Sequence, residues 1–129
     1  MQTIKIAGKE LILEFTAAAY EMVESDAELE TVYNFAEHMK GKGWMKRIAK
    51  YIAILNNAHL LKEGAKPTMT AEWVLNNTAP GDFIAKLDIK AAVAQEIFES
   101  LALQSVDDSD EEVDVVKEEI EKKEDAGIS

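Results

Sequence analysis

The chain has 129 residues, no cysteine, and 14 lysines and arginines against 25 aspartates and glutamates, which gives a formal net charge of −11. The length predicts a single domain, and the lack of cysteine excludes disulfides, thiolate nucleophiles, cysteine-bound zinc and iron–sulfur clusters. The negative charge argues against nucleic acid and anionic membranes as partners, because both would repel the chain. No apolar run approaches the ~20 residues that span a bilayer.

Two short segments near the start have the composition of β-strands. Residues 3–6 and 10–15 are rich in β-branched and large apolar side chains, and Ala7-Gly8-Lys9 lies between them. A glycine at this place accepts the positive φ of a tight turn. The pattern predicts a β-hairpin that helices must cover, because an isolated two-stranded ribbon is only marginally stable in water.

From Thr16 onward the apolar residues follow a helical period. Thr16 is a suitable N-cap for a short helix over residues 17–23. Ser25 and Glu28 have the spacing of a capping box, which predicts a second helix that runs to about Lys40. The apolar stripe of this second helix would consist of Leu29, Val32, Tyr33, Ala36 and Met39.

Three further helical segments follow. Two glycines, at positions 41 and 43, end the second helix, and a third is predicted from Trp44 to about Lys62. Thr70 can cap a short helix through Asn77. The last apolar pattern covers residues 83–101, and a break near Asp88 is one reading of it. The predicted fold class is mainly α with a small N-terminal β-hairpin (α+β), with four to five helices.

The excess negative charge is concentrated at the C-terminal end. Residues 105–129 contain eleven acidic residues and three lysines, whereas the rest of the chain is nearly balanced. We therefore expect a folded domain over residues 1–104 and an acidic, flexible tail over residues 105–129. Within the tail, Val113, Val116 and Ile120 recur at helical spacing, so the tail either stays solvated or folds as a helix against a partner.

Residues that could carry catalysis are few. The two histidines, His38 and His59, both fall on predicted helices and have no metal-ligand spacing around them. No serine lies in a nucleophile-elbow context, and no glycine-rich phosphate loop follows a strand. The sequence therefore predicts no catalytic residue, no metal ligand and no cofactor site, and it argues against an enzyme.

Two groups of side chains are candidates for contacts with a partner. Five basic residues surround the turn before the third helix, and they suit either an acidic partner, the acidic tail, or ordinary solvation of two helix ends: Lys40, Lys42, Lys46, Arg47 and Lys50. The two tryptophans, Trp44 and Trp73, are either core residues or interface anchors.

The layout of the chain also resembles a known family. It opens with Thr3-Ile4-Lys5-Ile6-Ala7-Gly8-Lys9-Glu10-Leu11, continues through Leu13-Glu14-Phe15-Thr16 into helices, and begins a later helix with Met69-Thr70-Ala71-Glu72-Trp73-Val74. This pattern is similar to the tail assembly chaperones of long-tailed bacteriophages and prophages, where T-I-x-G-K-x-x-x-L-x-F and L-T-x-E-x-V recur. The resemblance covers about residues 1–104. The chain departs from it by Ala7 before the glycine and by Met69 in place of leucine.

The resemblance implies a non-enzymatic role in the cytoplasm of a bacterial host. Such chaperones bind the tape measure protein, help to recruit the tail tube protein, and are absent from the mature virion. A homo-oligomer is compatible with this role. The expected partner-binding residues are aromatic side chains of the domain and apolar side chains of the tail: Trp44, Trp73, Phe83, Val113, Val116 and Ile120.

An alternative function is that of an acidic inhibitor or nucleic-acid mimic that binds a basic site on a partner. Its carboxylates would have to form a phosphate-like array on a rigid surface, whereas most of the surplus charge here lies in the tail. Salt separates the two functions. Mimicry weakens steeply with ionic strength, while binding through an apolar groove persists.

Overall fold

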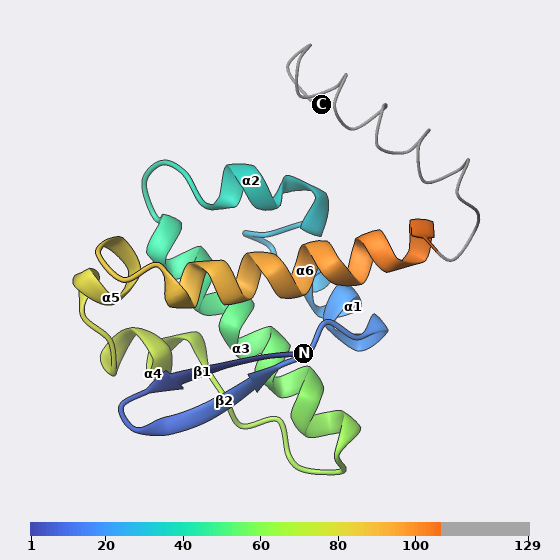
Figure 1. The fold of residues 1–129 in the computed structure, drawn as a ribbon, viewed down its shortest axis with the longest axis horizontal. Coiled ribbons are helices and arrows are strands. Elements are labelled where there is room, and N and C mark those ends of the chain that lie inside the picture. The colour runs from blue at the N-terminus through green and yellow to red at the C-terminus, as the bar shows by residue number, and fades with distance from the viewer. Residues whose placement is uncertain (107–129) are drawn as a thin grey trace. The chain divides into compact units, whose positions relative to one another are not determined.

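The computed structural model describes residues 1–106, with side chains up to residue 101, and it confirms a mainly helical chain with an N-terminal antiparallel hairpin (Figure 1). One compact unit covers residues 1–96 and a second begins at Ile97, before the boundary predicted at residue 104. The predicted flexibility of the tail and the residues Val113, Val116 and Ile120 lie outside the described part. The elements are β1 (Gln2–Ile6), β2 (Lys9–Leu13), α1 (Ala17–Ser25), the 3-10 turn η1 (Val32–Asn34), α2 (Phe35–His38), α3 (Trp44–Lys62), α4 (Ala71–Asn76), α5 (Pro80–Ile84) and α6 (Asp88–Val106).

The hairpin forms in the predicted place. Strands β1 and β2 pair antiparallel, with Ile4 opposite Leu11 and Ile6 opposite Lys9. The two-residue turn has positive φ at Ala7 (53°) and Gly8 (79°), as a tight hairpin turn requires at both positions. The apolar side chains at alternate positions are buried, so one face of the hairpin belongs to the core.

Helix α3 is the centre of the first unit and has the bounds that the sequence predicts. It packs against β2, α1 and α4. Tyr51 is the largest of its fully buried side chains. Polar contacts fasten β2 to the helix: Asn56 Nδ2 donates to the carbonyl oxygen of Ile12 at 3.0 Å, and the Glu14 amide donates to the carbonyl of Leu55 at 3.2 Å. The hairpin is thus covered on one edge by α3.

The segment that leads to α4 is held to α3 by one asparagine. Asn57 Oδ1 accepts from the Met69 amide, and its Nδ2 donates to the Met69 carbonyl, both at 2.8 Å. Thr70 then caps α4 as predicted, since its hydroxyl oxygen accepts from the Trp73 amide at 3.0 Å. The Asn57 side chain therefore replaces the backbone partner that this connector lacks.

We expect Asn57→Ala to lower the free energy of unfolding by about 2 kcal/mol, because the backbone amide and carbonyl of the buried Met69 both lose their partner. Urea denaturation followed by circular dichroism measures the change. The matched control is Asn76→Ala on the exposed side of α4, which should cost less than about 0.5 kcal/mol. Equal losses in both variants would show that the Asn57 bonds contribute nothing particular.

The second predicted helix is wrong in its first half. Ser25 belongs to α1, so it is not an N-cap. Asp26 instead accepts from the amides of Glu28 (2.8 Å) and Leu29 (3.0 Å), which closes a local turn, and Glu30 has a positive φ of 64°. An aspartate side chain that bonds the backbone two and three residues ahead competes with helix formation.

The predicted apolar stripe of that helix is also partly wrong. Leu29 and Val32 are buried as expected, but Tyr33 is 71% exposed and Ala36 is exposed. The buried residues after Val32 are Phe35 and His38. The spacing of three arises because the segment begins as a 3-10 turn, which has three residues per turn instead of 3.6.

The last apolar pattern forms two helices, and the break between them lies near Asp88, as one reading of the sequence predicted. Helix α5 ends at Ile84 and α6 begins at Asp88, where the Ala91 amide donates to the Leu87 carbonyl. The Asp82 carboxylate accepts from the Ala79 amide at 2.8 Å and closes the first turn of α5. With the second helix shortened and the last one divided, the described residues contain six α-helices where four to five were predicted.

Candidate functional site

The first tryptophan lies at the junction of three elements. Trp44 begins α3, and its ring packs edge-on against Phe83 of α5, with the ring centroids 6.4 Å apart at 89°. The ammonium of Lys90, in the first turns of α6, lies 4.6 Å from the centroid of the Trp44 ring. Trp44 is half-buried, while Phe83 is only 1% exposed. The buried Phe83 ring thus packs against the Trp44 ring, and part of the Trp44 side chain remains accessible to solvent.

Two large apolar side chains next to this junction are exposed. Ile84 is 59% exposed and Leu87 is 61% exposed. They end α5 and precede α6, in the segment from Phe83 to Lys90 that we call the α5–α6 elbow. Phe83 and Lys90 both contact Trp44, so the two exposed side chains belong to a segment that is held to the tryptophan at both ends. The sequence did not single them out, since their apolar character fits a continuous buried helix equally well.

The second tryptophan lies apart from the first. Trp73 is half-buried on α4, and the ammonium of Lys9 lies 5.5 Å from the centroid of its ring. No ring contact joins Trp73 to Trp44 or Phe83 in the part of the chain that the structure describes. The structure therefore brings two of the three predicted aromatic residues together and leaves Trp73 as a separate position beside the hairpin.

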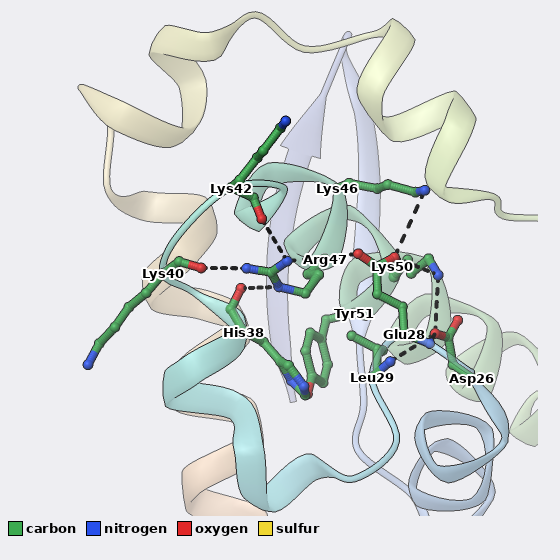
Figure 2. A network of polar contacts seen from close by, with 10 residues as sticks. All are labelled: Asp26, Glu28, Leu29, His38, Lys40, Lys42, Lys46, Arg47, Lys50 and Tyr51. Carbon is green, nitrogen blue, oxygen red and sulfur yellow. Dashed lines mark hydrogen bonds and ion pairs between the residues drawn. The ribbon is translucent and has the colours of Figure 1, made fainter.

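Two members of the basic cluster, Arg47 and Lys50, are tied into the fold, whereas the Lys40 and Lys42 side chains extend away from the network (Figure 2). The Arg47 side chain is 15% exposed and donates to three backbone carbonyls, those of His38 (2.7 Å), Lys42 (3.0 Å) and Lys40. These carbonyls follow the end of α2, where helix geometry leaves them without partners. Gly43, at φ 85°, leaves room for the guanidinium, since a Cβ there would lie 3.2 Å from Arg47 Nη1.

Two lysines of the cluster pair with the turn that replaced the predicted helix. Lys50 Nζ lies 3.1 Å from Asp26 Oδ1 and 3.0 Å from Glu28 Oε1, and Lys46 Nζ lies 3.9 Å from the same Glu28 oxygen (Figure 2). Burial raises the pKa of Asp26, but bonds from Lys50 and from two backbone amides outweigh it, so the pKa is lowered. These pairings favour an internal role for the cluster over a free surface for an acidic partner.

Both histidines lie on helices, as predicted, and each has a partner. His38 Nδ1 lies 2.6 Å from the buried Tyr51 hydroxyl. His59 Nδ1 lies 3.0 Å from Glu14 Oε1, and Lys62 contacts the other oxygen of the same carboxylate. Burial raises the pKa of Glu14, whereas the bonds from Lys62 and His59 lower it further than burial raises it.

Among the described residues, no three histidines, aspartates or glutamates gather where they could hold a metal ion. None of the described helices has the length and apolar character needed to cross a bilayer. A comparison of the chain with models of known protein families, with curated proteins and with solved structures found no match. The arrangement that remains as a candidate for function is the half-buried Trp44 with the exposed apolar side chains of the α5–α6 elbow.

Proposed function

We propose that this protein is a tail assembly chaperone of a long-tailed bacteriophage or prophage, which binds the tape measure protein through an apolar surface and assists assembly of the tail tube. The observation that carries the proposal is the exposure of Ile84 (59%) and Leu87 (61%) in the α5–α6 elbow, whose Phe83 and Lys90 contact the half-buried Trp44. Exposed apolar patches on small proteins mark sites of interaction. The motif resemblance described above supplies the class of partner.

The physical requirements of such a chaperone fit the described surface. A tape measure protein has long apolar helical stripes, which aggregate unless another surface covers them. Tryptophan and neighbouring aliphatic side chains are the residue types that anchor an amphipathic helix in a groove. The net charge of −11 keeps a complex of this kind soluble, because particles of like charge repel each other.

The test is co-expression with a tape measure protein of a long-tailed phage, followed by affinity purification and calorimetry. We expect Ile84→Glu with Leu87→Glu to weaken binding at least tenfold, because two charges would be buried at the interface. The matched control is Leu61→Glu, which changes an exposed apolar residue of α3, 44% exposed, and should leave binding unchanged. Trp73→Ala tests separately whether α4 belongs to the site.

Salt distinguishes this function from the acidic mimic. We expect the affinity to change less than threefold between 50 and 500 mM sodium chloride, because apolar burial does not depend on screening. An affinity that falls by orders of magnitude over this range would contradict the chaperone mode of binding. The chaperone function would also be contradicted if the tape measure protein, expressed without this chain, stayed soluble and reached the same amount as in the co-expression.

A further inference from the structure

The two edges of the hairpin have different surroundings. The outer edge of β2 is covered by α3, through the Asn56 bond to Ile12 and the Glu14 bond to Leu55. Strand β1 forms the other edge of the two-stranded sheet, and β2 is its main packing neighbour among the described elements. An edge strand presents a row of unpaired amide and carbonyl groups that can pair with another chain.

The register shows which groups of β1 face outward. The Ile12 carbonyl bonds to Asn56, so it points away from β1, and the pair of Ile12 with Thr3 is therefore a non-hydrogen-bonded pair. Such pairs alternate along an antiparallel ladder, so the pair of Lys5 with Glu10 is of the same kind. The amides and carbonyls of Thr3 and Lys5 thus point away from β2. None of these four groups bonds to another residue in the described part of the chain.

A cavity lies directly along this edge. Its volume is about 340 Å³, and β1 and the turn residue Ala7 form one wall. The other lining residues are mostly polar and carry both signs of charge: Asn77, Thr78, Asp82, Lys86, Asp88 and Ile89. The volume is at the lower end of the range for ligand pockets. The cavity therefore offers a place beside a free strand edge, with walls that tolerate a polar backbone.

We propose that the β1 edge binds an extended peptide segment of a partner protein, which adds a third strand to the hairpin inside this cavity. The four outward groups of Thr3 and Lys5 match two peptide residues that are two positions apart, as β-strand addition requires. A row of alternating donors and acceptors selects a polypeptide backbone in preference to a small metabolite. This inference does not depend on the function proposed above, because it uses neither Trp44 nor the exposed apolar side chains Ile84 and Leu87.

The side chains of β1 define the chemistry of the peptide. The residue between the two bonded positions lies beside the buried Ile4, 6% exposed, so it should be apolar. The residue opposite Lys5 should be acidic, since Lys5 is exposed and has no ion pair within the described residues, and opposite charges across strands attract. In the antiparallel orientation the preferred sequence is Glu-Val-Thr, with the threonine opposite Thr3.

The experiment titrates the full chain, labelled with nitrogen-15, with the blocked peptide acetyl-Thr-Glu-Val-Thr-Gly-amide. We expect chemical-shift changes confined to residues that line the cavity, 3–7, 77, 78, 82, 86, 88 and 89, and amide exchange of Thr3 and Lys5 slowed at least tenfold at saturation. The control peptide has the same side chains but is N-methylated at the glutamate and the second threonine, so it lacks the two amide donors and should not bind.

A charge exchange keeps the test independent of folding. The Lys5→Glu variant should bind the glutamate peptide at least fivefold more weakly and should bind a peptide with lysine at that position more tightly. Urea denaturation should show that the variant still folds, with a small loss of stability because the new glutamate lies opposite Glu10. No shifts at 5 mM peptide would overturn the proposal. Exchange of Thr3 and Lys5 that is already slow without peptide, or that slows as protein concentration rises, would also overturn it, since the edge would then be occupied within the chain or by a second copy.

Discussion

Replacing Arg47 by alanine should lower the free energy of unfolding by about 3 kcal/mol. The guanidinium donates to three carbonyls at and after the end of α2, those of His38, Lys40 and Lys42, and it is largely shielded from water. Buried acceptors that lose their donor cost about 1–3 kcal/mol each, and part of this loss is recovered because water can reach the carbonyls of Lys40 and Lys42. Urea denaturation monitored by circular dichroism gives the change, and the midpoint of thermal unfolding should fall by about 10–20 °C.

A charge-conserving variant separates geometry from charge. Arg47→Lys keeps the cation but has one ammonium in place of a planar fork, so it cannot reach three carbonyls together. We expect it to recover less than half of the loss. Lys46→Ala, at a neighbouring side chain that is 61% exposed, should cost below about 0.5 kcal/mol. Full recovery by lysine would show that the charge, and not the three bonds, stabilises this turn.

The second large effect concerns the buried pair of His38 and Tyr51. The hydroxyl of Tyr51 and His38 Nδ1 lie 2.6 Å apart, and the two rings are 5.7 Å apart. Burial, and after it the nearby Arg47 guanidinium, lowers the pKa of His38 below its ordinary 6.5. Tyr51→Phe removes the hydroxyl and leaves a buried ring nitrogen without this partner. We expect a loss of about 2 kcal/mol in the free energy of unfolding at pH 7.5.

The same pair should make the fold sensitive to mild acid. Because the pKa of His38 is lower in the folded chain than in the unfolded chain, the unfolded chain binds the proton more readily, and stability is lost as the pH falls below about 6.5. His38→Gln should flatten the dependence of unfolding free energy on pH between 7.5 and 5.5. If the unfolding free energy of the variant depended on pH as steeply as that of the parent chain in this window, groups other than His38 would cause the dependence.

Two carboxylates should add a separate loss at lower pH. The pKa values of Glu14 and Asp26 are lowered from 4.5 and 3.8 in the folded chain, so their contribution is present above those values and is lost as the pH falls further. The histidine and carboxylate losses therefore occupy different pH windows. Both losses lower the free energy of unfolding as the pH falls, so acid should destabilise the chain in two stages.

Some features were determined by the sequence itself because their causes are local. The hairpin follows from strand residues on both sides of a glycine turn, and helix α3 follows from a long helical period that starts after Gly43. The caps at Thr16 and Thr70 bond to amides three residues ahead, so they too depend only on neighbours in the chain. Patterns of this kind are readable without knowledge of any distant contact.

Other features were decided only by the tertiary structure. The capping-box spacing at Ser25 and Glu28 suggested a helix, but Asp26 closes a turn there and pairs with Lys50 of α3. Arg47 and Lys50 of the basic cluster became part of an internal network for the same reason, since their hydrogen-bond partners are 5 to 24 residues away along the chain. The exposure of Ile84 and Leu87 likewise depends on where α5 ends and α6 begins. A local pattern reports which side chains are apolar or charged, whereas burial and pairing depend on which distant segments pack beside them.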